Sequence, residues 1–334
     1  MGDLIEVTKR GLYCSKGDLF IDPWGKTDLA LITHAHADHA RPGAKRYVAT
    51  KASEPILRAR LGADINLQTV DYGEKLKFGD AWVSFHPAGH VLGSAQIRVE
   101  HGKDVWVVSG DYKRASDPTC TPFESVECTT FITEATFGLP VYRWQAPERV
   151  AQEIYEWWTG DPERPSILFC YAFGKAQRVL AELLRFTDRP VYLHGAVARL
   201  TDLYREGGIA MVPTESVSDY PKGHDFKGEL IIAPPSGHRS SWMKRFKLPQ
   251  TGFASGWMAV RGNRRRRGYE RGFVLSDHVD WTNLIKSVEE SKATTVFSTH
   301  GQTDVVSRYL RETRGLDARP LPAPYDGDDV EEAL

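Results

Sequence analysis

The sequence lacks the features of a membrane protein or a disulfide-stapled secreted domain. No apolar run in its 334 residues approaches the length of a bilayer-spanning helix. The first eleven residues, MGDLIEVTKRG, contain no apolar signal segment. The four cysteines are scattered without a CxxC pair, which favours reduced thiols over zinc ligands or disulfides. We therefore expect a cytoplasmic protein that does not contact membranes.

An excess of charge of one sign is also missing, because 43 Lys and Arg residues face 44 Asp and Glu residues. With a net charge of −1, attraction to nucleic acid must come from a local patch. Residues 261–271, RGNRRRRGYER, hold six arginines. Clustered guanidinium groups neutralise phosphates through charge-assisted contacts, so we interpret this run as a phosphate clamp, with a solvated loop as the alternative. The candidate phosphate contacts are Arg261, Arg264, Arg265, Arg266 and Arg267, with Lys113 as a further candidate.

Short β-rich runs alternate with helical patterns along the chain, which predicts an α/β protein with two parts. The expected helices are 53–61, 148–158 and 176–186. The expected strands are 28–33, 81–86, 105–109, 129–133, 166–171, 230–233, 272–275 and 294–298.

The run THAHADHA, residues 33–40, brings four metal-ligand side chains into six residues: His34, His36, Asp38 and His39. The apolar run before it reads as a buried strand, so the ligands lie where a strand gives way to a loop. A single histidine is usually structural. Three imidazoles and a carboxylate at this spacing indicate a metal site.

Three further side chains follow apolar strands and can complete the site. His90 lies in the glycine-rich segment 86–96, Asp111 follows VWVVSG, and His300 follows VFST. Imidazole and carboxylate ligands suit Zn²⁺ and tolerate Mn²⁺. Seven ligands exceed the needs of one tetrahedral ion, so we expect two divalent ions, zinc first and manganese as the alternative. Two ions about 3.5–4 Å apart lower the pKa of a bound water towards about 7, which predicts hydrolysis.

These motifs resemble those of the metallo-β-lactamase superfamily, and the segments that follow resemble its β-CASP nucleases. Residues 131–138, FITEATFG, resemble the acidic motif of that group, and residues 173–177, FGKAQ, the opening of its cap domain. SDHVD at 276–280 and THG at 299–301 resemble its second and third motifs. HADHARPG and LHGAVARLTDLY look most like the bacterial ligase-associated DNA exonuclease group.

The resemblance implies a metallo-β-lactamase αβ/βα sandwich built from residues 1–147 and 272–334, with a β-CASP cap, residues 148–271, inserted and the active site in the cleft between the two parts. It also implies a role for each site residue. His34, His36 and His90 would hold the first metal, Asp111 would bridge, and Asp38, His39 and His300 would hold the second. Asp38 and Asp111 would thereby also take part in catalysis. His278 would act as general acid, Glu134 would orient it, and Asp28 would support the histidine loop.

The resemblance implies that the protein would be a two-metal nuclease that hydrolyses DNA, as an exonuclease in repair alongside a ligase and helicase system. His300 matches the RNA-processing members, whereas DNA-directed eukaryotic members tend to carry valine there. An RNA-processing β-CASP ribonuclease, acting as an endonuclease or 5′→3′ exonuclease, therefore stays as an alternative. A small-molecule metallohydrolase is disfavoured by the cap motifs and the arginine run, and a metal-binding module without turnover by His278. Strand polarity and oligomeric state are not encoded in these motifs.

Overall fold

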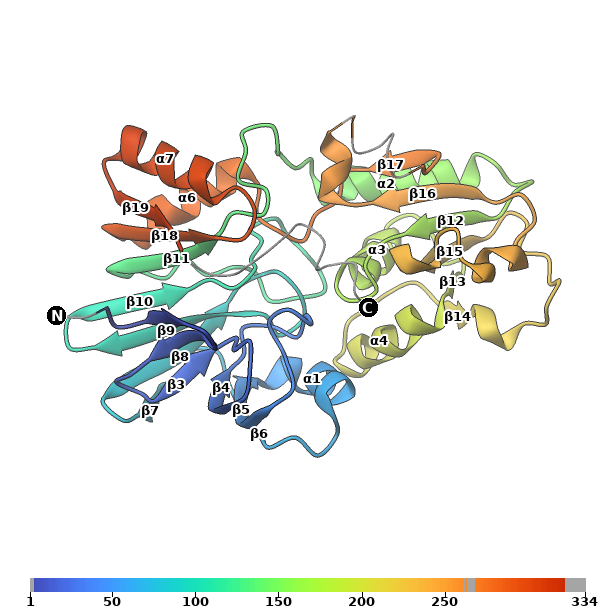
Figure 1. Cartoon of the computed structure of the whole chain (residues 1–334). Helices are drawn as coiled ribbons and strands as arrows, with labels where there is room; N and C mark the ends of the chain where they lie inside the picture. The colour runs from blue at the N-terminus through green and yellow to red at the C-terminus, as the bar shows by residue number, and fades with distance from the viewer. Residues whose placement is uncertain (1–2, 261, 263–267, 322–334) are drawn as a thin grey trace. The chain divides into compact units, whose positions relative to one another are not determined.

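The computed structural model describes residues 3–260, 262 and 268–321, and these form a mixed α/β chain of two compact units (Figure 1). Unit 1 comprises the described residues up to Arg114, then Cys120–Arg143, then those from His278 onward. Unit 2 comprises Ala115–Thr119 and Trp144–Asp277. The sequence predicts boundaries after residues 147 and 271. In the structure the chain passes between the units at 143–144 and 277–278, with the short excursion at 115–119 in addition.

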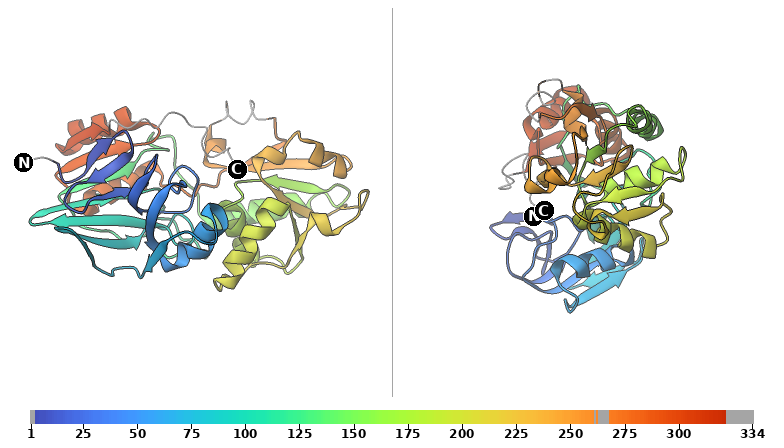
Figure 2. Two further views of the ribbon diagram at one scale, coloured as in Figure 1. Left: turned by 60° about the horizontal axis from the view of Figure 1, so that its bottom comes forward. Right: turned by 90° about the vertical axis from the view of Figure 1, so that its right-hand side faces the viewer.

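Unit 1 contains two sheets that pack face to face; in Figures 1 and 2 the strands of the first are blue, and those of the second run from teal through green to red-orange. The first sheet has the order β1-β2-β3-β4-β5-β6. Its strands are Glu6–Thr8, Gly11–Cys14, Leu19–Ile21, Thr27–Leu31, Ala44–Thr50 and Leu67–Val70, and α1, Glu54–Leu61, connects the last two. The second sheet has the order β19-β18-β11-β10-β9-β8-β7. Its strands, β7 to β11 and then β18 and β19, are Leu76–Phe78, Ala81–Pro87, Ala95–His101, Asp104–Val108, Thr130–Glu134, Thr295–Thr299 and Asp317–Pro320.

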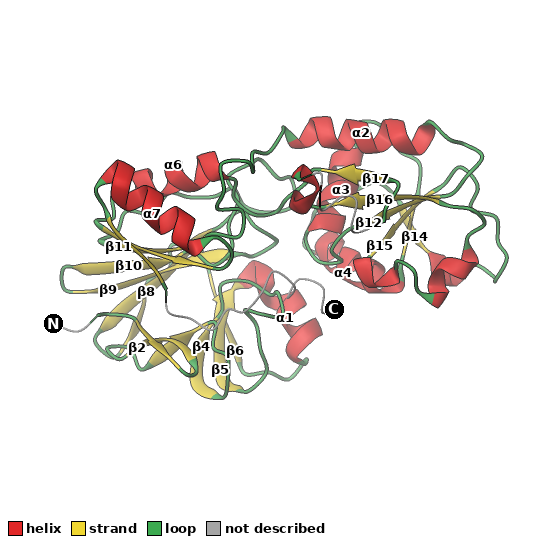
Figure 3. Cartoon of the chain, turned by 45° about the horizontal axis from the view of Figure 1, so that its top comes forward, coloured by secondary structure: helices red, strands yellow, loops and turns green. Residues whose placement is uncertain are grey.

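The alternation of side chains along these strands builds two cores in unit 1. Between the sheets, Leu31 and Val48 pack with Phe85, Ile97 and Val108. On the other face of the second sheet, residues from α6, Trp281–Ser291, and α7, Thr303–Arg314, join a second core that includes Val107, Phe131 and Val296 from the strands. Both helices lie along that face in Figure 3. The second sheet is therefore covered on both sides, which leaves its strand ends and loops as the places for polar side chains.

Unit 2 contains a parallel sheet of order β14-β13-β15-β12-β16-β17. Its strands, β12 to β17, are Ser166–Phe169, Val191–Leu193, Thr214–Ser216, Leu230–Ala233, Gln250–Ala254 and Arg271–Phe273. Its helices α2, α3 and α4 are Pro147–Thr159, Lys175–Leu183 and Gly195–Glu206, and its 3₁₀ turns are Val217–Asp219, Pro235–Gly237, Ser241–Arg245 and Gly256–Ala259. The near-continuous apolar strands β12 and β15 are buried throughout, as expected for the centre of a parallel sheet.

All four cysteines are free thiols, as the scattered spacing predicts. Among the described residues, no helix combines the length and the apolar character needed to cross a bilayer.

Candidate metal centre

The topology of unit 1 brings the predicted ligands to one edge of the second sheet. Strands β10, β11 and β18 are parallel neighbours, and they are followed or ended by Asp111, Glu134 and His300. Strand β9 is antiparallel to β10, so the β8–β9 loop that carries His90 lies at the same edge. The histidine loop follows β4 of the facing sheet, and its Thr33 oxygen accepts a hydrogen bond from Ala95 N at the start of β9 (2.8 Å).

The structure groups the seven predicted ligands into two clusters. In the first, His34, His36, His90 and Asp111 offer ligand atoms that all lie within 4.8 Å of one another. The second cluster contains Asp38, His39 and His300 at the same spacing. The residues of each cluster are those that the family resemblance implies for the first and the second metal.

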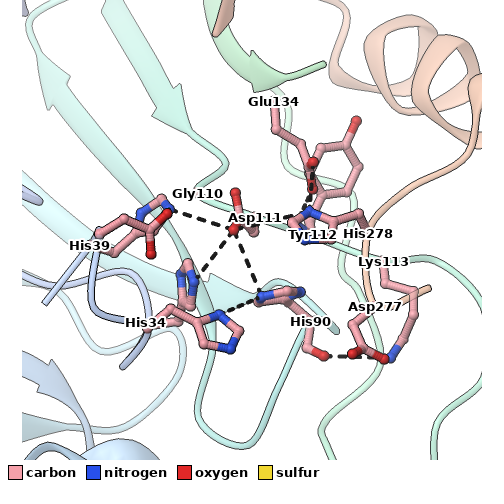
Figure 4. A network of polar contacts seen from close by, with 12 residues as sticks. His34, His39, His90, Gly110, Asp111, Tyr112, Lys113, Glu134, Asp277 and His278 are labelled. Carbon is pink, nitrogen blue, oxygen red and sulfur yellow. Dashed lines mark hydrogen bonds and ion pairs between the residues drawn. The ribbon is translucent and has the colours of Figure 1, made fainter. Parts of the chain in front are cut away.

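One carboxylate oxygen, Oδ2 of Asp111, lies at the centre of the site (Figure 4). It is 3.5 Å from His34 Nε2, 3.5 Å from His39 Nε2 and 3.8 Å from His90 Nε2. His34 and His90 belong to the first cluster and His39 to the second. A single oxygen with this set of neighbours has the position that a bridging ligand needs.

The chemistry of the buried nitrogens tests whether divalent ions fit here. His34 Nε2 and His39 Nε2 are buried and form no hydrogen bond with any described residue. Burial, with the neighbouring charges of His39 and His90, holds the pKa of His34 well below its usual range, so its imidazole is neutral near pH 7. A neutral imidazole with a buried nitrogen aimed at a carboxylate is a metal ligand ready to bind, so the residues fit a divalent cation.

The second cluster differs from the first because one of its histidines, His39, carries an extra proton. Burial lowers the pKa of His39, but the charges of Asp38 and Asp111 outweigh it, so that this pKa lies well above the usual range. Burial lowers the pKa of His300 to about 4. Burial raises the pKa of Asp111, but the charges of His39 and His278 hold it well below the usual range. Asp111 is therefore ionised near pH 7, and a cation in the second cluster has to displace the proton of His39.

The prediction for Asp28 is wrong, and Asp22 takes the place assigned to it. Asp28 is exposed on β4 and pairs with Lys45 (2.6 Å). Asp22 is buried after β3, where its Oδ2 accepts a hydrogen bond from His39 Nδ1 (2.7 Å), and its carboxylate also accepts hydrogen bonds from the amide and hydroxyl of Thr33 (2.8 and 2.5 Å). The strand-end position that selected Asp111 also applies to Asp22, which follows the apolar strand Leu19–Ile21, and could have found it.

The loop that carries His90 depends on close backbone packing. Ser94 Oγ accepts hydrogen bonds from the amides of His90 and Val91 (3.0 and 3.2 Å). Gly89 has a φ of +72°, and a Cβ there would lie 2.3 Å from the backbone oxygen of Lys113. Lys113 is predicted to reach substrate phosphate, but it is buried and its Nζ donates to the backbone oxygen of His90 (3.4 Å). Its position therefore supports the loop.

Backbone strain accompanies His300, the last of the predicted ligands. His300 has a φ of +56°, in the left-handed region that residues other than glycine rarely adopt. Such strain is retained where the surrounding structure imposes it, and it concentrates at functional sites. The imidazole of His300 lies beside that of His39, with ring centroids 5.5 Å apart.

His278 and Glu134 form a buried pair next to Asp111. Oε2 of Glu134 accepts a hydrogen bond from Nδ1 of His278 (2.8 Å), and Oε1 accepts one from the amide of Tyr112 (2.8 Å). His278 Nδ1 is 4.0 Å from Asp111 Oδ2. Burial raises the pKa of Glu134, and the neighbouring His278 opposes this shift. The hydrogen bond to the carboxylate fixes the ring orientation of the histidine.

The predicted arginine clamp lies largely outside the described residues, since Arg261, Arg264, Arg265, Arg266 and Arg267 are not among them. Of the six arginines in the run, Arg271 begins β17 and is exposed.

No family model matches the chain. In an alignment of 316 residues that covers 92% of this chain, it is 30% identical to a protein of Opitutus terrae named "Probable DNA ligase", and it covers 30% of that protein. It is 26% identical to the transcription termination factor FttA of Pyrococcus abyssi, over 54% of this chain and 34% of the relative. It is 24% identical to an RNase J-like protein of Methanocaldococcus jannaschii, over 53% of this chain and 49% of the relative. The chain thus spans less than half the length of each of these relatives.

The fold is similar to that of a crystallised protein of unknown function from Enterococcus faecalis, with a TM-score of 0.62 and 13% sequence identity. That similarity covers 88% of this chain and 79% of the other. Together with the motifs, the sequence relatives support a place for the chain in the metallo-β-lactamase/β-CASP superfamily.

Proposed function

We propose that the protein is a two-metal nuclease that hydrolyses phosphodiester bonds of DNA, as an exonuclease in DNA repair. The observation that carries the proposal is the position of Asp111 Oδ2, within 4.0 Å of nitrogens from both ligand clusters and from His278. A site that only stores a metal does not need a second cluster or a buried histidine–carboxylate pair beside the shared ligand. Hydrolysis of a charged ester uses all three.

When bound, the two ions supply an activated water and neutralise charge that develops on the phosphoryl oxygens. The ligands that would hold these cations are imidazoles and carboxylates, the types that zinc and manganese accept. Zinc is our first choice and manganese the alternative. Asp22, through His39, sets the tautomer that leaves Nε2 of that ring for the metal.

His278 is proposed as the general acid. Because Nδ1–H of His278 donates its hydrogen bond to Glu134 Oε2, the proton for the leaving oxygen comes from Nε2 of the same ring. The buried carboxylate also stabilises the protonated imidazole, which keeps a donor available near neutral pH. A histidine in this role explains why a buried ionisable pair is placed next to the ligands, where burial is otherwise costly.

The substrate class rests on the relatives and on charge. The match to the protein named "Probable DNA ligase" covers 92% of this chain and 30% of that protein, and that name refers to DNA, so DNA is the substrate that we favour. The arginine run at 261–271 is the proposed source of phosphate contacts in a chain whose net charge is −1. A ligase and helicase repair system is the proposed functional setting.

An RNA-processing activity is the second candidate, because one relative is named RNase J-like and because His300 stands at the third motif. The deciding experiment incubates the purified protein with 5′- and 3′-labelled DNA and RNA strands, with zinc and with manganese in turn. We expect mononucleotides from one labelled DNA end, with RNA intact. Rapid RNA cleavage with inert DNA would reverse the choice.

The same assay tests the metal centre through Asp111→Ala, with metal content measured for each preparation. His86→Ala is the matched control, because His86 pairs with Ser84 and Glu124 (2.9 and 3.1 Å) and belongs to neither ligand cluster. We expect no activity in the first variant and wild-type activity in the second. Full nuclease activity in Asp111→Ala would refute the two-metal proposal.

A further inference from the structure

Helix α3 of unit 2 carries charged side chains that are buried with the rest of the helix. Every residue from Lys175 to Leu183 is buried. In the expected helix 176–186, Val179, Leu180, Leu183 and Leu184 recur at helical spacing, which predicts an amphipathic helix, and such a helix normally leaves its polar face in water. Lys175 and Arg178 are each 2% exposed, so their charges need partners within the protein.

The partners are two carboxylates from segments at the borders of unit 2. Arg178 Nη1 donates to the backbone oxygen of Ser276 (2.7 Å) and to Asp277 Oδ1 (3.2 Å), and its Nε lies 3.5 Å from Asp117 Oδ2. Lys175 Nζ lies 3.6 Å from the other oxygen of Asp277. Two cations and two anions are thus paired in a cluster whose formal charge sums to zero.

Position in the chain gives this cluster its importance. Asp277 is the last residue of the Trp144–Asp277 segment of unit 2 and is joined by one peptide bond to His278. Asp117 lies within the excursion Ala115–Thr119, six residues after Asp111. It also accepts hydrogen bonds from the amide and hydroxyl of Thr119 (2.8 and 2.6 Å), which fixes the turn of that excursion. Arg178 therefore anchors both segments through which the chain reaches the proposed acid and leaves the proposed bridging ligand.

The cluster contributes to the position of the chain more than to its stability. Buried ion pairs add little net stability compared with apolar residues of the same volume, because desolvation of the charges offsets their attraction. A guanidinium differs from an apolar side chain in its planar donors, which reach several acceptors at fixed angles. Here those donors reach a backbone oxygen and a side chain of consecutive residues, so they define the path of the chain just before His278.

We propose that Arg178, assisted by Lys175, is a positioning residue that holds Asp277 and Asp117 and thereby fixes His278 for proton donation to the leaving oxygen. The inference rests on the proposed function. The positioning role predicts that Arg178 affects the rate of hydrolysis of a substrate whose leaving oxygen has to be protonated. It also predicts no effect on the rate for a substrate whose leaving group departs without a proton.

The test compares two substrates with Arg178→Gln and with the wild type. One is labelled DNA, whose leaving oxygen needs a proton, and the other is the p-nitrophenyl ester of thymidine 5′-monophosphate, whose nitrophenolate leaves without one. We expect kcat on DNA to fall on the order of 100-fold, the loss typical of a misplaced catalytic group. KM for DNA, hydrolysis of the nitrophenyl ester and the content of two metals should stay near the wild-type values.

Two further variants keep the test interpretable. Arg185→Gln is the matched control, because Arg185 follows the same helix, is half exposed and pairs with Glu182 (3.1 Å). It should act on both substrates as the wild type does. If Arg178→Gln does not fold, Arg178→Lys takes its place, because lysine retains the buried charge without the planar donors. This variant should show a smaller loss of kcat on DNA and no loss on the nitrophenyl ester.

Equal losses on both substrates, or no loss on DNA, would overturn the positioning role while leaving the proposed function intact. A metal-loaded wild type that hydrolyses neither substrate would instead overturn the proposed function, and the inference with it.

Discussion

Asp22→Asn should weaken metal binding at the second cluster while preserving the fold. Asp22 accepts three hydrogen bonds, two from Thr33 and one from His39 Nδ1. Asparagine keeps one oxygen for the Thr33 amide, and its NH₂ group can donate to the Thr33 hydroxyl. That NH₂ group also faces His39, so Nδ1 of the ring must become an acceptor. The ring then loses its Nδ1 proton and keeps the proton on Nε2, the nitrogen 3.5 Å from both Asp38 and Asp111.

The size of the effect follows from this tautomer change. To bind a cation through Nε2, His39 must move its proton from Nε2 to Nδ1. Two hydrogen-bond donors, Nδ1–H of His39 and the NH₂ group of the new asparagine, then face each other in a buried position. Removing such a supporting hydrogen bond lowers metal affinity by about 10–100-fold. This corresponds to about 1.4–2.8 kcal/mol at 25 °C.

Titration calorimetry of the metal-free protein with Zn²⁺ and with Mn²⁺ measures the two sites, and circular dichroism checks the fold. Asp28→Asn is the matched control, since Asp28 is an exposed acid of the neighbouring strand that pairs with Lys45. We expect two tight sites in the control and a single tight site in Asp22→Asn. Wild-type affinity at both sites in Asp22→Asn, or an equal reduction in the control, would refute the reasoning.

Four other outcomes are expected, three from the structure and one from the arginine run of the sequence. His278→Ala should lower kcat on nucleic acid by about 10²–10⁴-fold with metal content unchanged, and an unchanged rate in single-turnover assays would exclude it as the acid. Because the pKa of His39 is raised in the metal-free protein, the ring is protonated at pH 7, so affinity at the second cluster should rise with pH. Calorimetry in buffers of different ionisation enthalpy should detect the released proton, and no release at pH 7 would contradict this. Gly89→Ala should lower the melting temperature more than Gly102→Ala, since both have positive φ but only the first brings a Cβ within 2.3 Å of a backbone oxygen. Equal melting temperatures would show that the loop relaxes. Replacing the arginines at 264–267 with glutamine should weaken the salt dependence of DNA binding. The slope of the logarithm of the binding constant against the logarithm of salt concentration should become less negative by about 0.9 for each phosphate that is no longer neutralised. An unchanged slope would place the phosphate-binding groups elsewhere.

Elements with strong local patterns are predictable from the sequence. The expected strand 230–233 coincides with β15, and the expected helix 53–61 ends, as predicted, before Gly62. Local composition does not reveal the short edge strands β1 and β7, three residues each, because their pairing partners come from elsewhere in the sheet. The same holds for α3, whose polar residues read as a solvated face but are buried and paired.

The two acids near the histidine loop show where sequence reasoning fails. Asp28 is closer to the loop in sequence, yet on β4 its side chain points to solvent. Asp22 is farther away, but β3 is paired in parallel with β4, so the ends of the two strands lie together. A pairing between strands decides which acid reaches His39, and no local pattern encodes that pairing.

The chemistry of the site can be read from the chain alone, because histidine and aspartate ligands are recognised by type, spacing and position after apolar strands. The geometry of the site comes from the tertiary fold. His34 and His278 are 244 residues apart, and only the folded sheets bring both within 4.0 Å of one oxygen of Asp111. The same folding placed Arg178 against Asp277, because the ends of distant segments meet only when the chain is packed.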